Sequence, residues 1–420
     1  MLVSVISGAG SRDPSVLDEL ASLASSAGLT VVGRCVFRKD RRHAALFVGP
    51  GQADEIAEQF DSANAGLVIF DNALGPVQQR NLNARWSVPV LDRTELILEI
   101  FSARAHSREG KLQVELARLE HLSARLVRGW THLERQRGGI GGRGGPGEKQ
   151  VELDRRMLGV RVKRLRKDLE LIRRQRANRR RARHRNQAVK ISLVGYTNAG
   201  KSTLFNRLSG AKTMAADQLF ATLDTLTRRV HLPGIGDVML SDTVGFVRDL
   251  PHALIDAFKA TLEETAEADL LLHVIDGSSD QRRDQIEQVQ QVLLEIGADH
   301  IPVIEVFNKM DRLGGGVPMP AELAAEPREP ASGGDISEPS LVPCDSISRI
   351  AVSAVTGSGI DELLSKLSAW VGALRSEEPT INENTENTEN STSTPSAKNV
   401  DVNAESTIGQ NGINSSPADT

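Results

Sequence analysis

The sequence predicts an α/β protein in which two α/β units flank a helical hairpin and a disordered tail follows. Three observations lead to this prediction. Short β-branched runs alternate with helical patterns in residues 1–100 and again in 188–375. Between them, leucines recur every three or four residues among charged residues, as on the buried face of a helix. The last stretch, 376–420, is polar and nearly devoid of apolar residues, so it cannot bury a core.

The composition is typical of a soluble protein from a reducing compartment. The chain has 420 residues, 39% hydrophobic and 25% charged, and only Cys35 and Cys344, too few for a disulfide framework. No stretch approaches the roughly 18 apolar residues of a membrane span, and the first residues lack the basic region of a signal peptide. We therefore expect a soluble, cytoplasmic protein without stable membrane insertion. A monomer is the expected oligomeric state, although the sequence does not determine it.

The first unit, 1–100, is expected to be a small α/β layer domain. Helical patterns such as "PSVLDELASLASSAG" separate its apolar runs. The runs that predict its strands are "LVSVIS", "LTVVGRCVF", "AALFVG", "GLVIF" and "VPVLD".

Residues 101–187 are predicted to form an antiparallel pair of helices with a glycine-rich loop, 138–148, at the tip. Seven of the ten residues from Gly138 to Gly147 are glycine. Such a loop lets two helices reverse direction. The apolar positions of the two helices are Leu112, Leu116, Leu119, Leu122 and Leu126 in the first, and Leu158, Val162, Leu165, Leu169 and Ile172 in the second.

The second helix of this hairpin is strongly basic. From Arg155 to Arg185 there are fifteen Lys or Arg against Asp168 and Glu170. A generic charge run is a solvated helix face, but this density of one sign favours a polyanionic partner whose phosphates neutralise it.

The second α/β unit, 188–375, opens with a phosphate-binding motif. After the strand-like "ISLVG", residues Gly195 to Ser202 read G-x-x-x-x-G-K-S, directly before a helical pattern. Backbone N–H groups of such a loop surround phosphates, Lys201 reaches the β and γ oxygens, and Ser202 is a ligand of Mg²⁺. The nucleotide-contacting residues predicted here are Gly195, Asn198, Ala199, Gly200, Lys201, Ser202 and Thr203.

Three further motifs point to guanine nucleotide hydrolysis. "DTVGF" places Asp242 at a strand end to hold Mg²⁺, with Gly245 at the γ-phosphate. In "NKMD", Asp311 accepts both guanine N–H protons, a donor pair that adenine lacks. Asn308 and Lys309 of this motif shape the base pocket. The third motif, "SAVTGSGI", supplies Ser353 and Ala354 for backbone contact with the guanine oxygen.

Residues 314–342 interrupt this unit with Pro, Gly, Ala and Glu, and are expected to form a surface insertion.

Taken together, "FVGPGQADEI", "ARLVRGW", the glycine loop, "GYTNAGKSTLFN", "DQLFATLD", "DTVGFVRDLP", "NKMD" and "SAVTGSGI" resemble the HflX family of ribosome-associated GTPases over nearly the whole chain before the tail. The resemblance implies a P-loop GTPase domain with a mostly parallel sheet, behind an N-terminal α/β domain and a hairpin. It also implies binding to the large ribosomal subunit and ribosomal RNA, splitting of stalled or idle ribosomes, and association with ribosomes or a membrane surface.

The resemblance extends to single residues. Thr222 matches the switch threonine that closes over Mg²⁺ and the γ-phosphate, and joins Lys201 and Gly245 as a catalytic candidate. Asn198 lies where related GTPases hold a monovalent cation, so K⁺ is a second candidate cofactor, although a plain loop cap is the alternative. Phe246 replaces a water-orienting glutamine, so turnover needs a borrowed group. The residues expected at ribosomal RNA are Arg143, Gly144, Gly145, Arg179, Arg180, Arg181 and Arg183.

Two other functions remain open from the residues alone. One is an RNA-binding scaffold in which GTP only selects a conformation. The other is an RNA-remodelling NTPase that acts away from ribosomes. For the glycine loop, a flexible linker is the alternative to an RNA-contacting tip.

Overall fold

The computed structural model describes residues 1–6, 14–38, 43–136, 146–183, 188–210, 219–220, 222–234, 236–248, 262, 264–313 and 349–377. Within the two long hairpin helices, side chains are described at 108–125, 153 and 155–175. The described residues up to Arg375 belong to one compact unit. The predicted insertion and nearly all of the predicted tail lie outside the described residues.

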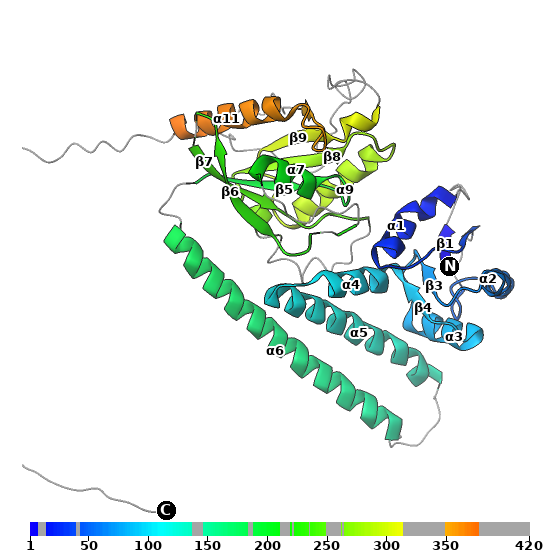
Figure 1. Cartoon of the computed structure of the whole chain (residues 1–420). Coiled ribbons are helices and arrows are strands. Elements are labelled where there is room, and N and C mark those ends of the chain that lie inside the picture. Colours follow the sequence, from blue (N-terminus) through cyan, green and yellow to red (C-terminus); the bar gives the residue numbers. More distant parts are fainter. Residues whose placement is uncertain are drawn as a thin grey trace, which may run out of the picture. The chain divides into compact units, whose positions relative to one another are not determined.

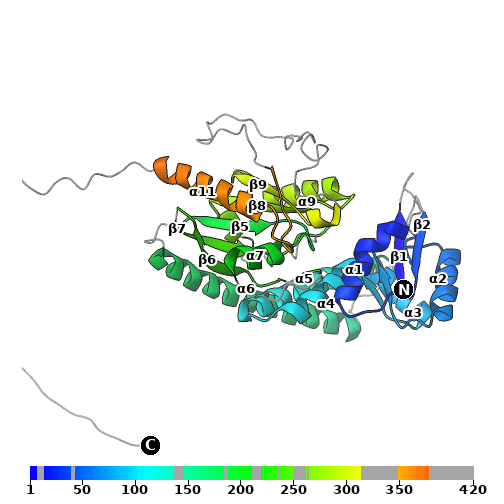
Figure 2. The ribbon, with the colours of Figure 1, turned by 45° about the horizontal axis from the view of Figure 1, so that its top comes forward.

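The N-terminal domain has a four-stranded, all-parallel sheet in the order β2-β1-β3-β4, with β1, β3 and β4 labelled in Figure 1 and β2 beside β1 in Figure 2. Helices pack on both faces, one face under η1, α1 and α4 and the other under α2 and α3. The strands are β1 (Leu2–Ile6), β2 (Arg34–Arg38), β3 (Val68–Phe70) and β4 (Val90–Asp92). The helices are η1 (Pro14–Leu17), α1 (Asp18–Ser26), α2 (Pro50–Ser62), α3 (Pro76–Trp86) and α4 (Arg93–Arg104).

The strand predicted at "AALFVG" is wrong. This stretch is a turn closed by a bridge between His43 and Phe47, and Phe47 has a left-handed φ of 65°. Its side chain is buried against Phe70, edge to face, with ring centroids 6.1 Å apart. The apolar run therefore contributes to the core without joining the sheet.

The predicted boundary between residues 100 and 101 falls inside a helix. Asp92 caps α4 by accepting a hydrogen bond from the Glu95 N–H at 2.9 Å, and α4 continues to Arg104 before the chain turns. Capping of this kind fixes where a helix begins. The break before the hairpin comes at 105–107.

The hairpin consists of α5 (Arg108–Gln136) and α6 (Pro146–Arg183), which lie side by side and antiparallel, as predicted (Figure 1). Leu116, Leu165 and Leu169 are buried between the two helices. The predicted loop 138–148 is shorter than expected at its C-terminal end, because α6 already begins at Pro146. Proline suits a first helical position, since its φ is pre-set and its missing N–H has no helical partner to lose. Residues 137–145 lie outside the described residues.

The C-terminal domain has a six-stranded sheet, ordered β10-β9-β8-β5-β7-β6, in which only β6 is antiparallel to its neighbour. This confirms the predicted, mostly parallel sheet. The strands are β5 (Lys190–Val194), β6 (Leu226–Leu232), β7 (Gly236–Asp242), β8 (Leu270–Asp276), β9 (Val303–Asn308) and β10 (Arg349–Ala351). The helices are α7 (Lys201–Ser209), α9 (Arg282–Glu295), η3 (Met310–Leu313) and α11 (Ile360–Glu377).

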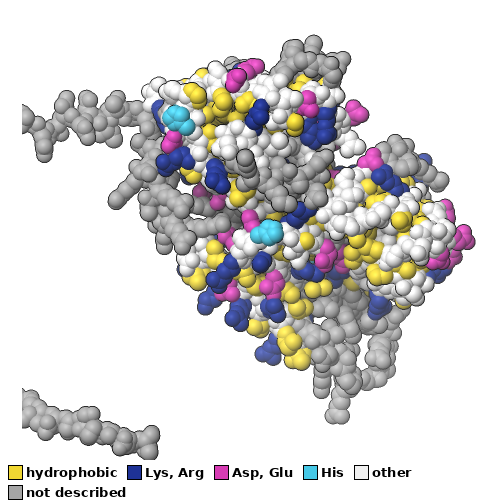
Figure 3. Space-filling model, viewed as in Figure 1, with side chains coloured by type: hydrophobic (Ala, Val, Ile, Leu, Met, Phe, Trp, Pro, Cys, Tyr) yellow, Lys and Arg dark blue, Asp and Glu magenta, His cyan; other side chains and the backbone are white. Residues whose placement is uncertain are grey.

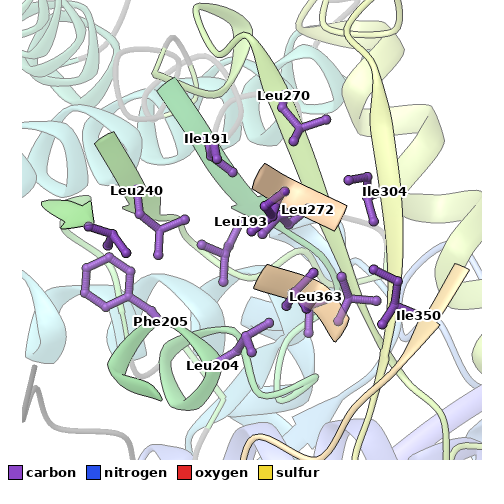
Figure 4. Close-up of a cluster of buried hydrophobic side chains, with 14 of the residues drawn as sticks. Ile191, Leu193, Leu204, Phe205, Leu240, Leu270, Leu272, Ile304, Ile350 and Leu363 are labelled. Atoms are coloured by element: carbon purple, nitrogen blue, oxygen red, sulfur yellow. The ribbon is translucent and has the colours of Figure 1, made fainter. Parts of the chain in front are cut away.

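Apolar side chains from α7 and α11 cover one face of this sheet. Figure 4 shows Phe205 of α7 and Leu363 of α11 gathered with the strand residues Leu193, Leu272 and Ile350. Helix α9 packs on the opposite face. This two-faced burial explains why β5 and β8 read as continuous apolar runs in the sequence.

The N-terminal and C-terminal domains share an apolar core. Phe101 of α4 meets Phe220 edge to face, with ring centroids 4.6 Å apart. Leu219, Leu223, Val244 and Val247 of the C-terminal domain are buried in the same cluster as α1 and α4. The segments on either side of Thr222 and after Asp242 are thus part of the N-terminal domain's core.

A buried polar network continues this contact. The guanidinium of Arg93 donates to Glu19 at 2.7 Å, to Asp71 at 2.9 Å and to the Arg248 carbonyl at 3.1 Å. Arg248 in turn pairs with Asp71 at 3.0 Å, and its N–H donates to the Tyr196 hydroxyl at 2.8 Å. Tyr196 donates to Glu19. Tyr196 belongs to the phosphate-binding motif, so the network ends at the candidate site.

Candidate nucleotide-binding site

The G-x-x-x-x-G-K-S motif forms the turn between β5 and α7, as its sequence predicts. Gly195 has φ 150°, and a Cβ there would lie 2.2 Å from the Val274 carbonyl oxygen. Gly200 has φ 93°, and its Cβ would lie 2.2 Å from the Asn308 amide nitrogen. Only glycine fits at either position. The turn leaves the first N–H groups of α7 without helical partners, a geometry that binds phosphate.

The ammonium of Lys201 lies inside this turn, where it donates to the Gly195 carbonyl at 3.0 Å and the Tyr196 carbonyl at 2.8 Å. Burial disfavours the charged form and lowers the pKa of Lys201 to about 8, although the Asp242 carboxylate acts to raise it. A bound phosphate would restore the charge.

We expect GDP binding to take up a proton above pH 8. Phosphate oxygens beside Lys201 raise its pKa in the complex, so a lysine that is mostly neutral in the free protein at pH 9 gains a proton on binding. Uptake nears one proton at about pH 9 and vanishes near pH 7, and affinity falls as pH rises through 8. Calorimetry in buffers of different ionisation enthalpy measures the proton count.

The control for this expectation is Lys201→Arg, which stays charged at both pH values and therefore takes up no proton. Equal uptake by the wild type at pH 7 and pH 9 would contradict the assignment to Lys201.

Three oxygen-bearing side chains meet beside Lys201. The Ser202 hydroxyl donates to Asp242 at 2.7 Å, the Thr222 hydroxyl donates to Asp242 at 2.9 Å, and the two hydroxyls are 2.8 Å apart. The second carboxylate oxygen of Asp242 is buried without a hydrogen-bond partner among the described residues. Burial raises the pKa of Asp242, so a cation would relieve the cost of its charge. This oxygen set suits Mg²⁺.

The predicted base-side residues also come together. Asn308, at the end of β9, donates to the Ala199 carbonyl at 3.0 Å and accepts from the Ala354 N–H at 2.9 Å. The Ser353 hydroxyl donates to Asp311 at 2.6 Å, which fixes that carboxylate. One amide side chain therefore ties the phosphate turn to both base-side loops.

Lys309 is held by a residue that the sequence motifs did not indicate. Its ammonium lies 2.8 Å from Asp276, the last residue of β8, and its φ is 63°. The only available signal was the position of Asp276 at a strand end next to β9.

These residues line a cleft of about 510 Å³. Of the predicted residues, those at its wall are Asn198, Gly200, Lys201, Ser202, Thr203, Thr222, Gly245, Asn308, Lys309, Asp311 and Ala354. Gly195, Ala199, Asp242 and Ser353 are buried behind the wall, and each forms a hydrogen bond with a wall residue. The wall residues that sequence reasoning missed are Thr197, Phe220, Thr243, Arg312 and Val355.

Gly245 lines the cleft, whereas the side chain of Phe246 points into the core. A Cβ on Gly245 would lie 2.8 Å from the Thr197 Cα and 3.0 Å from the Lys201 ammonium, so the backbone passes close to the phosphate turn. Phe246 is 3% exposed and packs inward against Leu271 and α9. Its side chain therefore lies in the core, where it cannot orient a water molecule.

The structure does not describe the side chains of the residues expected at ribosomal RNA. Arg143, Gly144 and Gly145 fall outside the described residues. Arg179, Arg180, Arg181 and Arg183 belong to α6, but their side chains are not described.

A phosphate turn, an oxygen-ligand cluster and an N-K-x-D base pocket on the carboxyl ends of one parallel sheet define a P-loop GTPase. Family models match as GTP-binding GTPase N-terminal at 15–102, GTP-binding GTPase Middle Region at 104–183, and 50S ribosome-binding GTPase at 190–309. GTPase HflX of Escherichia coli is 48% identical over 85% of this chain and 79% of its own length. The chain belongs to the HflX family of GTPases, and it hydrolyses GTP.

A second relative and a solved structure also match the chain. GTPase HflX of Magnetococcus marinus is 47% identical over 85% of this chain and 78% of its own length. The structure of a GTP-binding protein from the archaeon Sulfolobus solfataricus with GDP is 22% identical, covers 89% of this chain and 100% of that chain, and has a TM-score of 0.44. Along the part of this chain that the structure describes, no helix is both long and apolar enough to span a bilayer.

Proposed function

We propose that this GTPase binds the large ribosomal subunit, splits stalled or idle ribosomes, and is reset by GTP hydrolysis. The observation that carries the proposal is the antiparallel hairpin, a long arm with a basic second helix that is built into the same compact unit as the nucleotide site. The family model that matches residues 190–309, a 50S ribosome-binding GTPase, supports the choice of partner.

The described part of the arm offers charge to phosphates. Figure 3 shows Lys and Arg side chains along it, with Asp and Glu among them. Arg161, Arg166 and Arg174 pair with acidic side chains of the hairpin, yet they remain 65%, 66% and 74% exposed. Exposed pairs of this kind contribute little, about 0–1 kcal/mol, so RNA phosphates can compete for these arginines.

The site residues take the following roles in this proposal. Mg²⁺ is held by Ser202, Thr222 and Asp242 together with the nucleotide, and it neutralises charge on the phosphates. Lys201 contacts the β and γ oxygens, while the Gly245 N–H contacts the γ-phosphate. Asp311 selects guanine.

Because Phe246 faces the core, hydrolysis without a partner is slow in this proposal, and the large subunit supplies the missing stabilisation. K⁺ beside Asn198 is a second source of positive charge. Asn198 is exposed at the cleft with φ 62°, a conformation that asparagine tolerates.

The arm and the tip of the hairpin have different roles in this proposal. Arg179, Arg180, Arg181 and Arg183 hold phosphates, and the tip with Arg143, Gly144 and Gly145 enters an RNA cleft. The protein acts as a monomer in the cytoplasm, bound to ribosomes during its cycle.

Purified ribosomes sedimented with the protein and GTP, a non-hydrolysable GTP analogue or GDP test this function. We expect free subunits with GTP and with the analogue, but not with GDP. Binding without subunit separation would favour the scaffold, and stimulation by RNA but not by large subunits would favour remodelling away from ribosomes.

The arm gives a sharper test. Changing Arg179, Arg180, Arg181 and Arg183 together to glutamine should weaken binding to large subunits and reduce the slope of log affinity against log salt by about 3, since each lost phosphate contact removes about 0.7–0.9. Pelleting across a salt series measures both.

The matched control removes four arginines elsewhere in the chain, Arg228, Arg229, Arg283 and Arg375, and should leave the slope unchanged. Equal loss of slope in both variants would assign the effect to net charge, and the arm would lose its role.

A further inference from the structure

The segment that carries Thr222 also contacts the hairpin. Two residues after Thr222, the Asp224 carboxylate accepts hydrogen bonds from the backbone N–H groups of Ser107 at 2.8 Å and His106 at 3.3 Å, and from the Ser107 hydroxyl. These residues immediately precede α5. Only two positions along the chain therefore separate Thr222, at the nucleotide cleft, from Asp224, which contacts the start of the first hairpin helix.

The contact is part of the helix start itself. The Ser107 hydroxyl accepts from the Gly110 N–H at 2.8 Å, and the Ser107 carbonyl accepts from the Lys111 N–H at 3.1 Å, so Ser107 caps α5. The Asp224 carboxylate adds a negative charge at this positive helix end, an arrangement that stabilises both partners.

Thr222 is anchored from its other side as well. The Leu219 N–H donates to the Ser26 hydroxyl of α1 at 2.9 Å, and Phe220 packs on Phe101 of α4. Leu223, between Thr222 and Asp224, is 3% exposed in the same core. Both flanks of Thr222 are thus held by the N-terminal domain and the hairpin while its hydroxyl lies at Asp242.

We propose that Asp224 is a positioning residue that holds Thr222 at the metal site by binding the start of α5, so that the hairpin and the γ-phosphate of GTP influence each other. A γ-phosphate and Mg²⁺ that draw Thr222 inward strengthen the Asp224–Ser107 contact. By reciprocity, a partner that steadies the start of α5 raises affinity for GTP over GDP by the same factor.

This inference deepens the proposed function and depends on it only for the identity of what the hairpin binds. It makes no use of ribosomes in its test. If the protein does not split ribosomes, the coupling between the nucleotide and the start of α5 can still hold. If this coupling is absent, ribosome splitting needs another explanation.

Two substitutions break the contact from opposite sides. Asp224→Ala removes the carboxylate. Gly110→Ala changes no residue of the GTPase domain. Its new Cβ would lie 2.5 Å from the Asp224 carboxylate and 3.1 Å from the Ser107 hydroxyl, so it would push the two groups apart. Alanine is also the better helix former, so this variant does not act by weakening α5 itself.

The first readout is nucleotide affinity in Mg²⁺, measured with fluorescent GDP and a fluorescent non-hydrolysable GTP analogue. We expect both variants to bind the analogue about tenfold more weakly, the equivalent of one charge-assisted hydrogen bond, and GDP within about twofold of wild type. The control is Asp237→Ala, an exposed aspartate of β7 that pairs with Arg229. It should change neither affinity.

The second readout is hydrogen exchange at the first turn of α5. In the wild type, the analogue should slow exchange at the Gly110 and Lys111 amides relative to GDP, and both variants should lose this nucleotide dependence. A double change of Asp224→Ala with Ser107→Ala should cost no more analogue affinity than either change alone, because both remove one contact. Ser107→Thr, which keeps the hydroxyl, should retain the wild-type analogue affinity and the wild-type nucleotide dependence of exchange at α5.

Equal losses of GDP and analogue affinity would make Asp224 a purely structural cap and overturn the proposal. Wild-type analogue affinity in Gly110→Ala and Asp224→Ala, with unchanged exchange at α5, would overturn it as well.

Discussion

Asp311→Asn is expected to lower the affinity for GDP and GTP by about 100-fold or more. The carboxylate accepts two guanine N–H protons in the predicted complex, and each charge-assisted hydrogen bond contributes about 1.5–3 kcal/mol. An amide nitrogen in its place would point donors at donors. The Ser353 hydroxyl holds the carboxylate at 2.6 Å, so the side chain cannot easily turn away from the base.

The same variant should gain affinity for xanthosine diphosphate, because xanthine presents a carbonyl where guanine presents its amino group. Titration calorimetry with GDP, XDP and ADP compares the three bases on one protein. Asp299→Asn, an exposed aspartate between α9 and β9, serves as control and should leave GDP affinity unchanged. Wild-type affinities for ADP and GDP that are equal would disprove the base assignment.

Arg93→Ala is expected to lower the free energy of unfolding by about 3–5 kcal/mol, since it removes the buried guanidinium that pairs with Glu19 and Asp71 and leaves these carboxylates with the more exposed Arg248. The Arg93 side chain is 5% exposed, and its partners Glu19 and Asp71 are 19% and 8% exposed. The guanidinium also binds the Arg248 carbonyl, so the contact between the two domains should weaken with it.

Urea unfolding followed by circular dichroism measures this loss in the transition of residues 1–375. The matched control is Arg34→Ala, which breaks the Arg34–Asp18 pair, whose side chains are 34% and 61% exposed. We expect about 1 kcal/mol or less from the control. A loss from Arg93→Ala no larger than that of the control would show that the buried network does not stabilise the domain contact.

The sequence predicts the nucleotide site well because its motifs are local. A phosphate turn must follow a strand and start a helix, and an N-K-x-D motif must end a neighbouring strand of the same parallel sheet. Those constraints place Lys201, Asp242 and Asn308 at one sheet edge before any coordinates are known. The hairpin is equally predictable from the sequence, because leucines repeated every three or four residues lie on one face of a helix, and two such faces are buried when the helices pack together.

The contacts between the domains could not be read in this way. Tyr196 and Glu19 are 177 residues apart in sequence, and no periodic pattern marks two side chains that meet only after both domains have folded. Phe220 reads as one more apolar residue in a loop, and the apolar run around Phe47 reads as a strand. In each case tertiary packing determined the outcome, and local propensity did not.

The shared apolar core has a consequence for synthesis of the chain. Phe101 leaves the ribosome about 120 residues before Phe220, which at roughly 5–20 residues per second is a delay of about 6 to 24 s. Until then α1 and α4 face water on the side that Leu219, Phe220, Val244 and Val247 later cover. The N-terminal domain therefore completes its core only after much of the C-terminal domain has been translated. Nascent chains of intermediate length should be the forms that chaperones bind and proteases cut.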